Sequence, residues 1–358
     1  MATLKVLIIG PSPRGIVGGQ EVEAELLCRK WQDDPDLAVS FLPSNPSLPK
    51  WMREIEHIPF IRTLVRFPIY ARSLWTAMSP VDVAHVFSAS YSSFLLTCLP
   101  AWLISRWQGK RFVLNYHTAR SWEKFAASRL VRFVLSRTAN IVVPSAYLAA
   151  KFAEAGLSVS IVPNIIRDQF HYRPRTDLLP TILCARNLSP DYGIDVIIHA
   201  FAVVQAYYPD AVLYLIGDGP LRPDLEALVR RLGLSGVEFC GTVSNEQMPG
   251  WYERADLFVN ASFLDNAPLS IVEAMVCGMP VVTTAAGGIP WMVIHGVTAL
   301  IAPVGDPQAL AEQVLRLLRE KDLAAKIARQ AHDALGSYCW SSVRAKWLEV
   351  YGAGPAAS

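Results

Sequence analysis

The sequence of 358 residues is poor in several features that would assign it to a specialised class of protein. Its six cysteines form no C-x-x-C pair, and their mostly apolar neighbours predict reduced core residues. Charged residues make up 18% of the chain and hydrophobic residues 52%, which excludes an intrinsically disordered protein. No group of His, Cys and Asp residues has metal-ligand spacing, and DDPD at 33–36 predicts a turn.

Long apolar runs are also missing. The stretch HVFSASYSSFLLTCLPAWLIS at 85–105 contains five Ser and a central Pro, so it predicts a strand followed by a buried helix rather than a membrane span. A strand pattern begins directly in MATLKVLIIG, so we expect no cleavable signal and a cytoplasmic protein. GPSPRGIVGG lacks the G-x-G-x-x-G spacing of a nicotinamide-nucleotide loop, and no nucleic-acid recognition module is present.

Short apolar runs that alternate with helical patterns occupy most of the chain. The first half contains LKVLIIG, LAVSFLP, VDVAHVFS, RFVLNYH, ANIVVPS and SVSIVPN. After the polar connector NIIRDQFHYRPRTDLLP, the second half contains TILCARNL, AVLYLIGDG, VEFCGTV, DLFVNAS, MPVVTTA and TALIAP. This alternation predicts an α/β protein with two doubly wound, Rossmann-like parallel-sheet domains that face a cleft. We place the domains at 1–168 and 176–340, followed by a helix and tail at 341–358, and leave open whether that helix packs on the first domain.

The stretch FLDNAPLSIVEAMVCGMPVVTT at 263–284 carries two carboxylates eight positions apart. Ser270 and Glu273 fit an S-x-x-E capping box with Ser270 as the N-cap, which would explain Glu273 without a ligand. It would not explain Asp265 in the preceding loop. A helix N-terminus at the end of a strand is suited to a phosphate, and nearby carboxylates can accept hydrogen bonds from sugar hydroxyls. The stretch therefore indicates a ligand that contains a sugar, a diphosphate and a ribose.

These motifs, together with the rest of the chain, resemble the retaining glycosyltransferases of family 4 (GT4), which have the GT-B fold. The resemblance covers nearly the whole chain in the order of the family. It rests on GGQEVEAELL, NYHTAR, VPSAYL, VPNII, ARNLSPDYGIDVIIHAF, LIGDGPLRPDLEAL, VEFCGTVSNEQMPGWYERADLFVNAS, APLSIVEAMVCGMPVVTTAAGGIP and GVTALIAPVGDPQALAE.

The resemblance implies a donor site in the second domain. Glu273 would bind the ribose hydroxyls of a nucleotide-sugar donor, and Asp265 would bind hydroxyls of the donor sugar. The backbone amides near Leu269 and Ser270 would hold the diphosphate. Arg186, at the end of TILCAR, would neutralise the phosphates. Arg186 and Asp265 are both predicted to be catalytic.

The resemblance also implies contributions from three other segments. Thr242 and Val243, in the GTV segment, would line the base of the nucleotide. Gly18 and Gly19 would let a loop of the first domain approach the donor phosphates and the acceptor. His117, at the end of RFVLNYH, matches a family histidine near the reacting sugar and is the third predicted catalytic residue, although a histidine satisfied at a strand end would look the same.

The implied activity is retaining transfer from a nucleoside-diphosphate sugar, with UDP or GDP, to a glycan, lipid-linked or small-molecule acceptor, without a metal or other cofactor. Three positions depart from the family pattern. Tyr192 stands where a phosphate-binding Lys is common, Asp265 stands where Glu is common, and Trp291 stands where an acidic residue is common. These departures leave open a catalytically silent GT-B protein that binds a nucleotide sugar or serves as a scaffold.

The first half of the chain is the more basic one. Residues 1–170 carry 19 Lys and Arg against 12 Asp and Glu, whereas residues 171–358 carry 14 against 19. Residues 51–137 hold 12 Lys and Arg against four Asp and Glu, among many aromatic residues. This composition suits an anionic membrane surface and so predicts peripheral association at the inner face of a membrane. Helices packed on a sheet, with arginines that extend to water, would give the same pattern. We expect no nucleic-acid partner.

Overall fold

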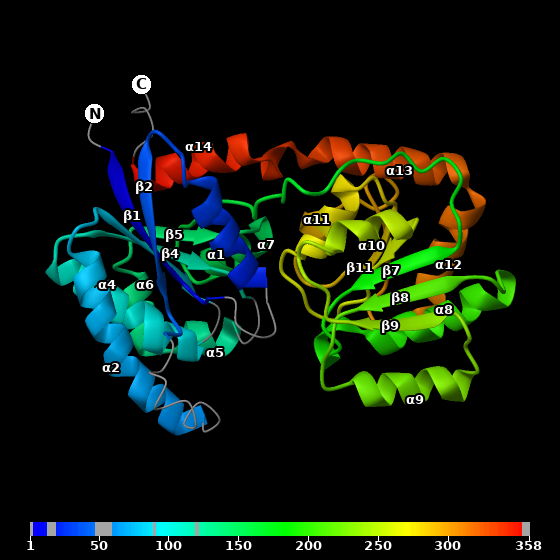
Figure 1. The fold of residues 1–358 in the computed structure, drawn as a ribbon, viewed down its shortest axis with the longest axis horizontal. Coiled ribbons are helices and arrows are strands. Elements are labelled where there is room, and N and C mark those ends of the chain that lie inside the picture. The colour runs from blue at the N-terminus through cyan, green and yellow to red at the C-terminus, as the bar shows by residue number, and fades with distance from the viewer. Residues whose placement is uncertain (1–2, 13–18, 47–58, 89–90, 119–121, 353–358) are drawn as a thin grey trace. The chain divides into compact units, whose positions relative to one another are not determined.

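The computed structural model describes residues 3–12, 19–46, 59–88, 91–118 and 122–352 (Figure 1). The chain divides into two compact units. Unit 1 consists of Met1–Ile165 and Trp340–Ser358, and unit 2 consists of Ile166–Cys339. Each unit contains one six-stranded parallel sheet with helices around it, as the sequence predicted.

The sheet of unit 1 has the strand order β2-β1-β3-β4-β5-β6. Its strands are β1 (Leu4–Gly10), β2 (Leu37–Pro43), β3 (Val83–Ser88), β4 (Arg111–Tyr116), β5 (Asn140–Val143) and β6 (Ser160–Ile161). Each of them falls within an apolar run that the sequence predicts as a strand.

The helices of unit 1 cover both faces of this sheet. They are α1 (Gly19–Lys30), α2 (Pro59–Met78), α3 (Tyr91–Ser93), η2 (Phe94–Cys98), α4 (Leu99–Trp107), α5 (Trp122–Ala127), α6 (Arg129–Leu135), α7 (Ala146–Glu154) and α14 (Trp340–Tyr351). On one face, Val6 and Ile8 of β1 share a core with α1 and α14. On the other face, Leu7 and Ile9 share a core with α2, α4, α5, α6 and α7. Alternate residues of one strand therefore serve two separate cores, which is why the strand reads as a continuous apolar run.

Unit 2 repeats this layering with a different strand order, β12-β11-β10-β7-β8-β9. Its strands are β7 (Thr181–Ala185), β8 (Val212–Ile216), β9 (Val237–Gly241), β10 (Leu257–Val259), β11 (Val281–Thr284) and β12 (Leu300–Ala302). Its helices are η3 (Pro190–Tyr192), α8 (Ile194–Tyr207), α9 (Arg222–Leu232), α10 (Met248–Arg254), α11 (Leu269–Val276), η4 (Ile289–Trp291), α12 (Pro307–Arg319), α13 (Lys321–Asp333) and η5 (Ala334–Tyr338).

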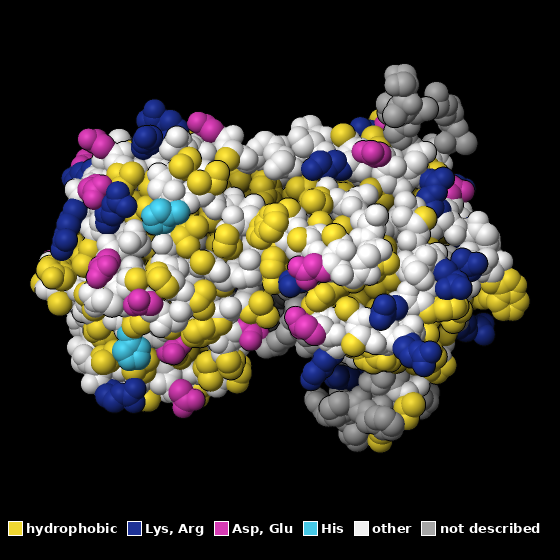
Figure 2. Space-filling model, turned by 180° about the vertical axis from the view of Figure 1, so that it is seen from behind, with side chains coloured by type: hydrophobic (Ala, Val, Ile, Leu, Met, Phe, Trp, Pro, Cys, Tyr) yellow, Lys and Arg dark blue, Asp and Glu magenta, His cyan; other side chains and the backbone are white. Residues whose placement is uncertain are grey.

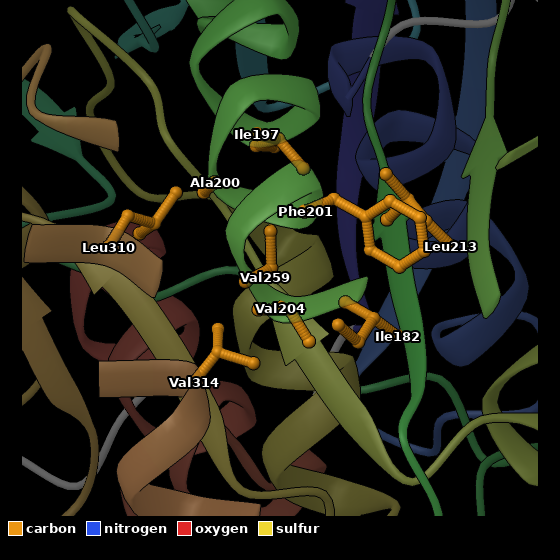
Figure 3. A pocket seen from close by; sticks show the side chains of 9 residues that line it. All are labelled: Ile182, Ile197, Ala200, Phe201, Val204, Leu213, Val259, Leu310 and Val314. Atoms are coloured by element: carbon orange, nitrogen blue, oxygen red, sulfur yellow. The ribbon is translucent and has the colours of Figure 1, made fainter. Parts of the chain in front are cut away.

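A small cavity lies in the core between the sheet of unit 2 and helices α8 and α12 (Figure 3). Nine apolar side chains line it: Ile182, Ile197, Ala200, Phe201, Val204, Leu213, Val259, Leu310 and Val314. Figure 3 shows these side chains on β7, β8, β10, α8 and α12, pointing toward a common space. Because no polar group lines it, this space is a packing gap rather than a ligand site.

Two expectations about buried residues are wrong in part. The helix that follows β3 was expected to be buried, yet only one side of it is, since Leu103 is 54% exposed and Trp107 is 80% exposed. The cysteines are all free, as expected, but Cys339 is exposed while Cys98, Cys184 and Cys277 are buried. Composition alone does not reveal which side of an amphipathic helix faces the sheet.

Candidate functional site

The strand order of unit 2 creates a topological switch point between β7 and β10. These strands are neighbours, but the chain runs from β7 outward through β8 to β9 and from β10 outward through β11 to β12. Ligands of open α/β sheets bind at the carboxyl ends of the strands at such a point. Arg186 follows β7 directly, and Asp265 lies in the loop that follows β10.

Arg186 and Asp265 meet in a half-buried ion pair between Nη2 and Oδ2. Their side chains are 13% and 12% exposed. Ser262 Oγ lies 3.1 Å from the same carboxylate oxygen and 3.0 Å from Asn260 Oδ1, so the loop after β10 supplies a short hydrogen-bonded chain. Two residues that are 79 positions apart in sequence are thereby fixed against each other.

Two glycines hold the backbone around this pair. Gly287 has φ +52°, and a Cβ built there would lie 2.1 Å from the carbonyl oxygen of Asp265. Gly217 has φ +126°, and a Cβ there would lie 2.1 Å from the carbonyl oxygen of Arg186. Neither position has room for a side chain, so both loops approach the site backbone to backbone. The amide of Gly288 also donates to the carbonyl of Asp265 at 2.9 Å.

Tyr192 occupies the position where the family commonly has Lys, and it contacts Arg186. The guanidinium of Arg186 lies 4.2 Å from the centre of the Tyr192 ring. Burial lowers the pKa of Arg186, and Tyr192 opposes this shift by stabilising the charged form. A cation held over an aromatic ring is attracted to the π face. Tyr192 therefore helps to orient Arg186, whose role toward a phosphate stays a prediction, although it does not replace the charge of the missing Lys.

Glu273 belongs to a second buried cluster on α11. One carboxylate oxygen pairs with Arg167 Nη2 at 2.5 Å, and the other accepts a hydrogen bond from the Tyr252 hydroxyl at 2.8 Å. Arg167 and Glu273 are each 9% exposed at the side chain. Burial raises the pKa of Glu273, while the adjacent Arg167 opposes that rise.

The capping box expected at Ser270 and Glu273 is wrong. The helix begins two residues earlier than that pattern requires, at Leu269, with Pro268 as its N-cap and no side-chain cap. Ser270 therefore lies inside the first turn, and among the described residues its buried hydroxyl has no hydrogen-bond partner. Proline at the cap position cannot offer a side-chain oxygen, and the carboxylate of Glu273 turns to Arg167 instead.

Arg167 is the site residue that sequence reasoning missed. It lies in the connector before β7, which the sequence indicates to be polar, yet Arg167 is only 8% exposed. Its Nη1 donates to Asn245 Oδ1 at 2.9 Å, and its guanidinium lies 4.7 Å from the Phe170 ring. The available signal was an arginine placed directly after the apolar run VPNII.

The other predicted donor residues of unit 2 lie at the same sheet edge but apart from the ion pair. Thr242 and Val243 follow β9, the edge strand, and β8 separates β9 from β7. Thr242 is exposed, while Val243 packs against the core that contains α10 and α11. Leu269, at the first position of α11, is half-buried. Their proposed roles toward a base and a diphosphate stay predictions.

In unit 1, His117 directly follows β4. Its backbone amide donates to the carbonyl of Ser88 at 3.1 Å, and its ring lies 5.2 Å from the Phe87 ring. Burial lowers the pKa of His117 to about 4, so its imidazole is neutral at physiological pH. Gly19 is the first residue of α1, and Gly18 lies outside the described residues.

The described parts of the chain contain no group of three or more His, Cys, Asp or Glu side chains placed to hold a metal ion. Within the same residues, no helix combines the length and the hydropathy needed to cross a bilayer.

Comparisons with known proteins agree with this geometry. The chain is 31% identical over 209 residues to an exopolysaccharide phosphotransferase of Streptomyces coelicolor, a match that spans 57% of this chain and 22% of that protein. It is 28% identical over 273 residues to a GDP-mannose-dependent alpha-(1-6)-phosphatidylinositol monomannoside mannosyltransferase of Mycolicibacterium smegmatis, which spans 69% and 72%. The fold is similar to that of Anabaena HepE in complex with UDP-glucose, with a TM-score of 0.75, 20% identity and coverage of 98% and 100%.

Two Rossmann-like units with these strand orders, and the likeness to HepE, define a protein of the GT-B fold class. Residues 17–170 match the family domain described as Glycosyltransferase Family 4, and residues 179–320 match the domain described as Glycosyl transferases group 1. The chain belongs to the family 4 type of glycosyltransferases.

Proposed function

We propose that this protein is a retaining glycosyltransferase. It moves a sugar from a nucleoside-diphosphate sugar, with UDP or GDP as the nucleotide, to a glycan, lipid-linked or small-molecule acceptor. It acts in the cytoplasm, at the inner face of the membrane. The observation that carries the proposal is the Arg186–Asp265 pair at the switch point of unit 2. HepE forms a complex with UDP-glucose and the mannosyltransferase relative is GDP-mannose-dependent, which supports a nucleotide-sugar donor.

The reaction needs positive charge beside the leaving group. When the bond between the sugar and the diphosphate breaks, negative charge develops on the phosphate oxygens. Arg186 is oriented by Asp265 and Tyr192, so it can meet that charge without rearranging. The free backbone N–H groups in the first turn of α11 add positive potential. With these groups present, the proposed transfer requires no metal ion.

The acceptor hydroxyl would attack from the face that the diphosphate leaves. Its proton would pass to the departing phosphate oxygen, the new glycosidic bond would form, and the configuration of the sugar would be retained. Asp265 Oδ1 receives a hydrogen bond from the Asn266 amide at 3.0 Å and keeps further lone-pair capacity for a sugar hydroxyl. Glu273 and Thr242 with Val243 would hold the ribose and the base.

Thermal unfolding with UDP, GDP, ADP, CDP and NAD, each at saturating concentration, tests the donor assignment. A ligand at about 100 times its dissociation constant adds about 2.7 kcal/mol to the free energy of unfolding. We expect a rise in the midpoint with UDP or GDP and none with NAD. The Arg186→Met variant should lose most of that rise. If no nucleoside diphosphate shifts the midpoint, the proposed function is wrong.

Tyr192 favours a second candidate, a silent GT-B protein that binds a nucleotide sugar without transferring it. Because Tyr192 stands where the family commonly has Lys, the protein lacks a cation that the family commonly places at the diphosphate. The variant Tyr192→Lys separates the two candidates when donor hydrolysis and transfer are assayed with and without acceptor. Turnover that exists only in the variant would support the silent protein, and turnover in the native protein would exclude it.

A further inference from the structure

Three neighbouring helical segments of unit 1 carry a run of exposed, large apolar side chains. The segments are α2, the continuous helix formed by η2 and α4, and α6. The exposed apolar side chains are Ile61, Leu64, Phe67, Trp75, Leu96, Leu103, Trp107, Leu130 and Phe133. We call this set the α2–α4–α6 surface. It lies on the side of these helices that faces away from the shared core, where Tyr70, Trp102 and Val131 are buried.

Aromatic contacts connect the three helices into one surface. The rings of Trp75 on α2 and Trp107 on α4 lie 5.0 Å apart in an edge-to-face arrangement. The amide of Gln108 donates to the backbone oxygen of Trp75 at 3.3 Å. The ring of Trp102 on α4 lies 6.3 Å from that of Phe133 on α6. The exposed groups therefore lie on helices that contact one another, with Trp75 and Trp107 in direct contact at the surface.

Two tryptophans on α4 differ strongly in exposure. On α4, Trp102 is 5% exposed and belongs to the core, while Trp107 is 80% exposed. Leu96, Leu103 and Trp107 recur at spacings of seven and four, which places them on one side of the helix. Large contiguous apolar patches on a soluble protein mark interaction sites, whereas scattered single residues do not.

The charge on these helices has one sign. Helices α2, α4 and α6 contain six arginines and no Asp or Glu. Five exposed arginines of these helices and their immediate neighbourhood are Arg72, Arg106, Arg129, Arg132 and Arg137. Two of them sit against aromatic rings, with the Arg137 guanidinium 3.8 Å from the Phe133 ring and that of Arg106 5.2 Å from the Trp102 ring. Figure 2 shows Lys and Arg side chains lying among apolar ones on this unit, at the right of the view.

We infer that the α2–α4–α6 surface docks on an anionic lipid bilayer. Tryptophan and tyrosine favour the interface between headgroups and acyl chains, and arginines next to them pair with lipid phosphates. Helices that combine exposed Trp and Leu with cations and carry no carboxylates of their own are complementary to such a membrane, although Glu123 and Glu154 lie near Arg132 at one side. This inference rests on the proposed function for its biological meaning, and it names the surface and the lipid charge behind the association with the membrane.

Co-sedimentation with vesicles tests the charge requirement. The native protein should bind vesicles of equimolar phosphatidylcholine and phosphatidylglycerol at low salt, and it should not bind vesicles of phosphatidylcholine alone. The double variant Arg106→Gln/Arg137→Gln should lose about 30-fold in the partition coefficient, because each cation near the surface contributes about a factor of five. The matched control is Arg230→Gln/Arg231→Gln on α9 of unit 2, which removes the same charge elsewhere and should change binding little.

A second pair of variants tests the apolar part. Trp107→Ala should weaken binding about tenfold, because its largely exposed side chain would no longer insert at the interface. Trp291→Ala removes an exposed tryptophan, 58% exposed, from unit 2 and should leave vesicle binding unchanged. Vesicle binding that does not depend on anionic lipid would overturn the inference. So would control variants in unit 2 that weaken binding as much as the matching variants in unit 1. So would a dimer in sedimentation velocity that Trp107→Ala dissociates, since the surface would then bind a second copy.

The outcomes separate this inference from the proposed function. Vesicle binding is measured without donor, and the thermal response to UDP or GDP is measured without lipid. Retained vesicle binding without any nucleotide response would count against the transferase alone. A nucleotide response without vesicle binding would count against the docking surface alone.

Discussion

The two units share one layered architecture but differ in the side chains at the ends of their strands. In unit 2, the loops after β7 and β10 bring together Arg186 and Asp265, and Arg167 pairs with Glu273 beside them. In unit 1, the ends of the neighbouring strands β3 and β4 carry Ser88 and His117. The two sheets are alike in layering, but different side chains stand at their strand ends, and those side chains decide what can bind there.

Two histidines of unit 1 also differ in charge from the arginine at the strand ends of unit 2. Burial lowers the pKa of His85 to about 3 and that of His117 to about 4, so both rings are neutral near pH 7. Neutral rings suit hydroxyl groups, whereas the arginine of unit 2 suits phosphates. His85 is fully buried and contacts the Tyr351 hydroxyl, so of these two rings only His117, at the end of β4, could contact the acceptor of the proposed reaction.

The largest expected effect comes from removing the cation at the switch point of unit 2. Arg186→Met should lower kcat by about 100- to 1,000-fold, because a preoriented donor to the developing phosphate charge is lost. Steady-state kinetics with the donor identified by thermal unfolding measure it. The control in unit 1 is Arg106→Gln, which also removes an arginine but should leave kcat unchanged with a water-soluble acceptor.

Arg186→Lys serves as the matched control for this prediction, because it keeps the charge and loses the planar fork. We expect it to recover part of kcat. If Arg186→Met retains full activity while its thermal midpoint is normal, the catalytic role of Arg186 is wrong.

The next effect concerns a buried carboxyl group in unit 1. Both oxygens of Glu23 lie 3.2 Å from the backbone amide of Ile165, the last residue before unit 2, and Glu23 is 3% exposed. Burial raises its pKa from 4.5 to about 8, and the amide hydrogen bond opposes this rise. Because the folded state then binds more protons than the unfolded state, the free energy of unfolding should fall as pH rises from about 5 to 8.

Glu23→Gln should remove this pH dependence, since an amide cannot ionise but can still accept from Ile165. The variant should match the native protein near pH 5 and exceed its free energy of unfolding by on the order of 3 kcal/mol at pH 9. Denaturant unfolding at the two pH values measures the difference. Equal stability of the two proteins at pH 9 would show that Glu23 ionises freely in the folded state.

The smallest expected effect returns to the second ion pair of unit 2. Arg167→Met should raise the pKa of Glu273 further, because burial then acts without the adjacent cation. Tyr252, Arg186 and Cys277 are the other titratable groups that face Glu273. Nucleotide affinity should fall about tenfold at pH 7 and recover as pH rises and Glu273 ionises. Titration calorimetry with UDP or GDP between pH 6 and 9 measures this.

The control for that prediction is Arg173→Met, which removes a half-exposed arginine that pairs with Asp256 in the same unit. It should leave the pH profile of nucleotide binding the same as that of the native protein. Arg167→Lys should restore most of the affinity. A profile for Arg167→Met identical to that of the native protein would contradict a role for Arg167 in lowering the pKa of Glu273.

The sequence predicted the strands well because most of them are buried on both faces and therefore consist of a short apolar run, whereas the edge strands β2, β6 and β9 are partly exposed. It also indicated that Arg186 and Asp265 follow strands, and the parallel sheet explains why they meet. It could not predict the Arg167–Glu273 pair, because the two residues are 106 positions apart and a local capping pattern offered a simpler explanation. That explanation is wrong because Pro268, not Ser270, occupies the N-cap position of α11.

The return of the last helix to unit 1 has a consequence for synthesis on the ribosome. Helix α14 supplies Trp347 and Tyr351 to the core of unit 1, and the Tyr351 hydroxyl lies 2.6 Å from Nδ1 of His85, 266 residues earlier. Unit 2 is continuous and can close its core while the chain is still being translated. Unit 1 must wait, with α1 alone on that face of its sheet, until residues 340–351 emerge, so its core closes after that of unit 2.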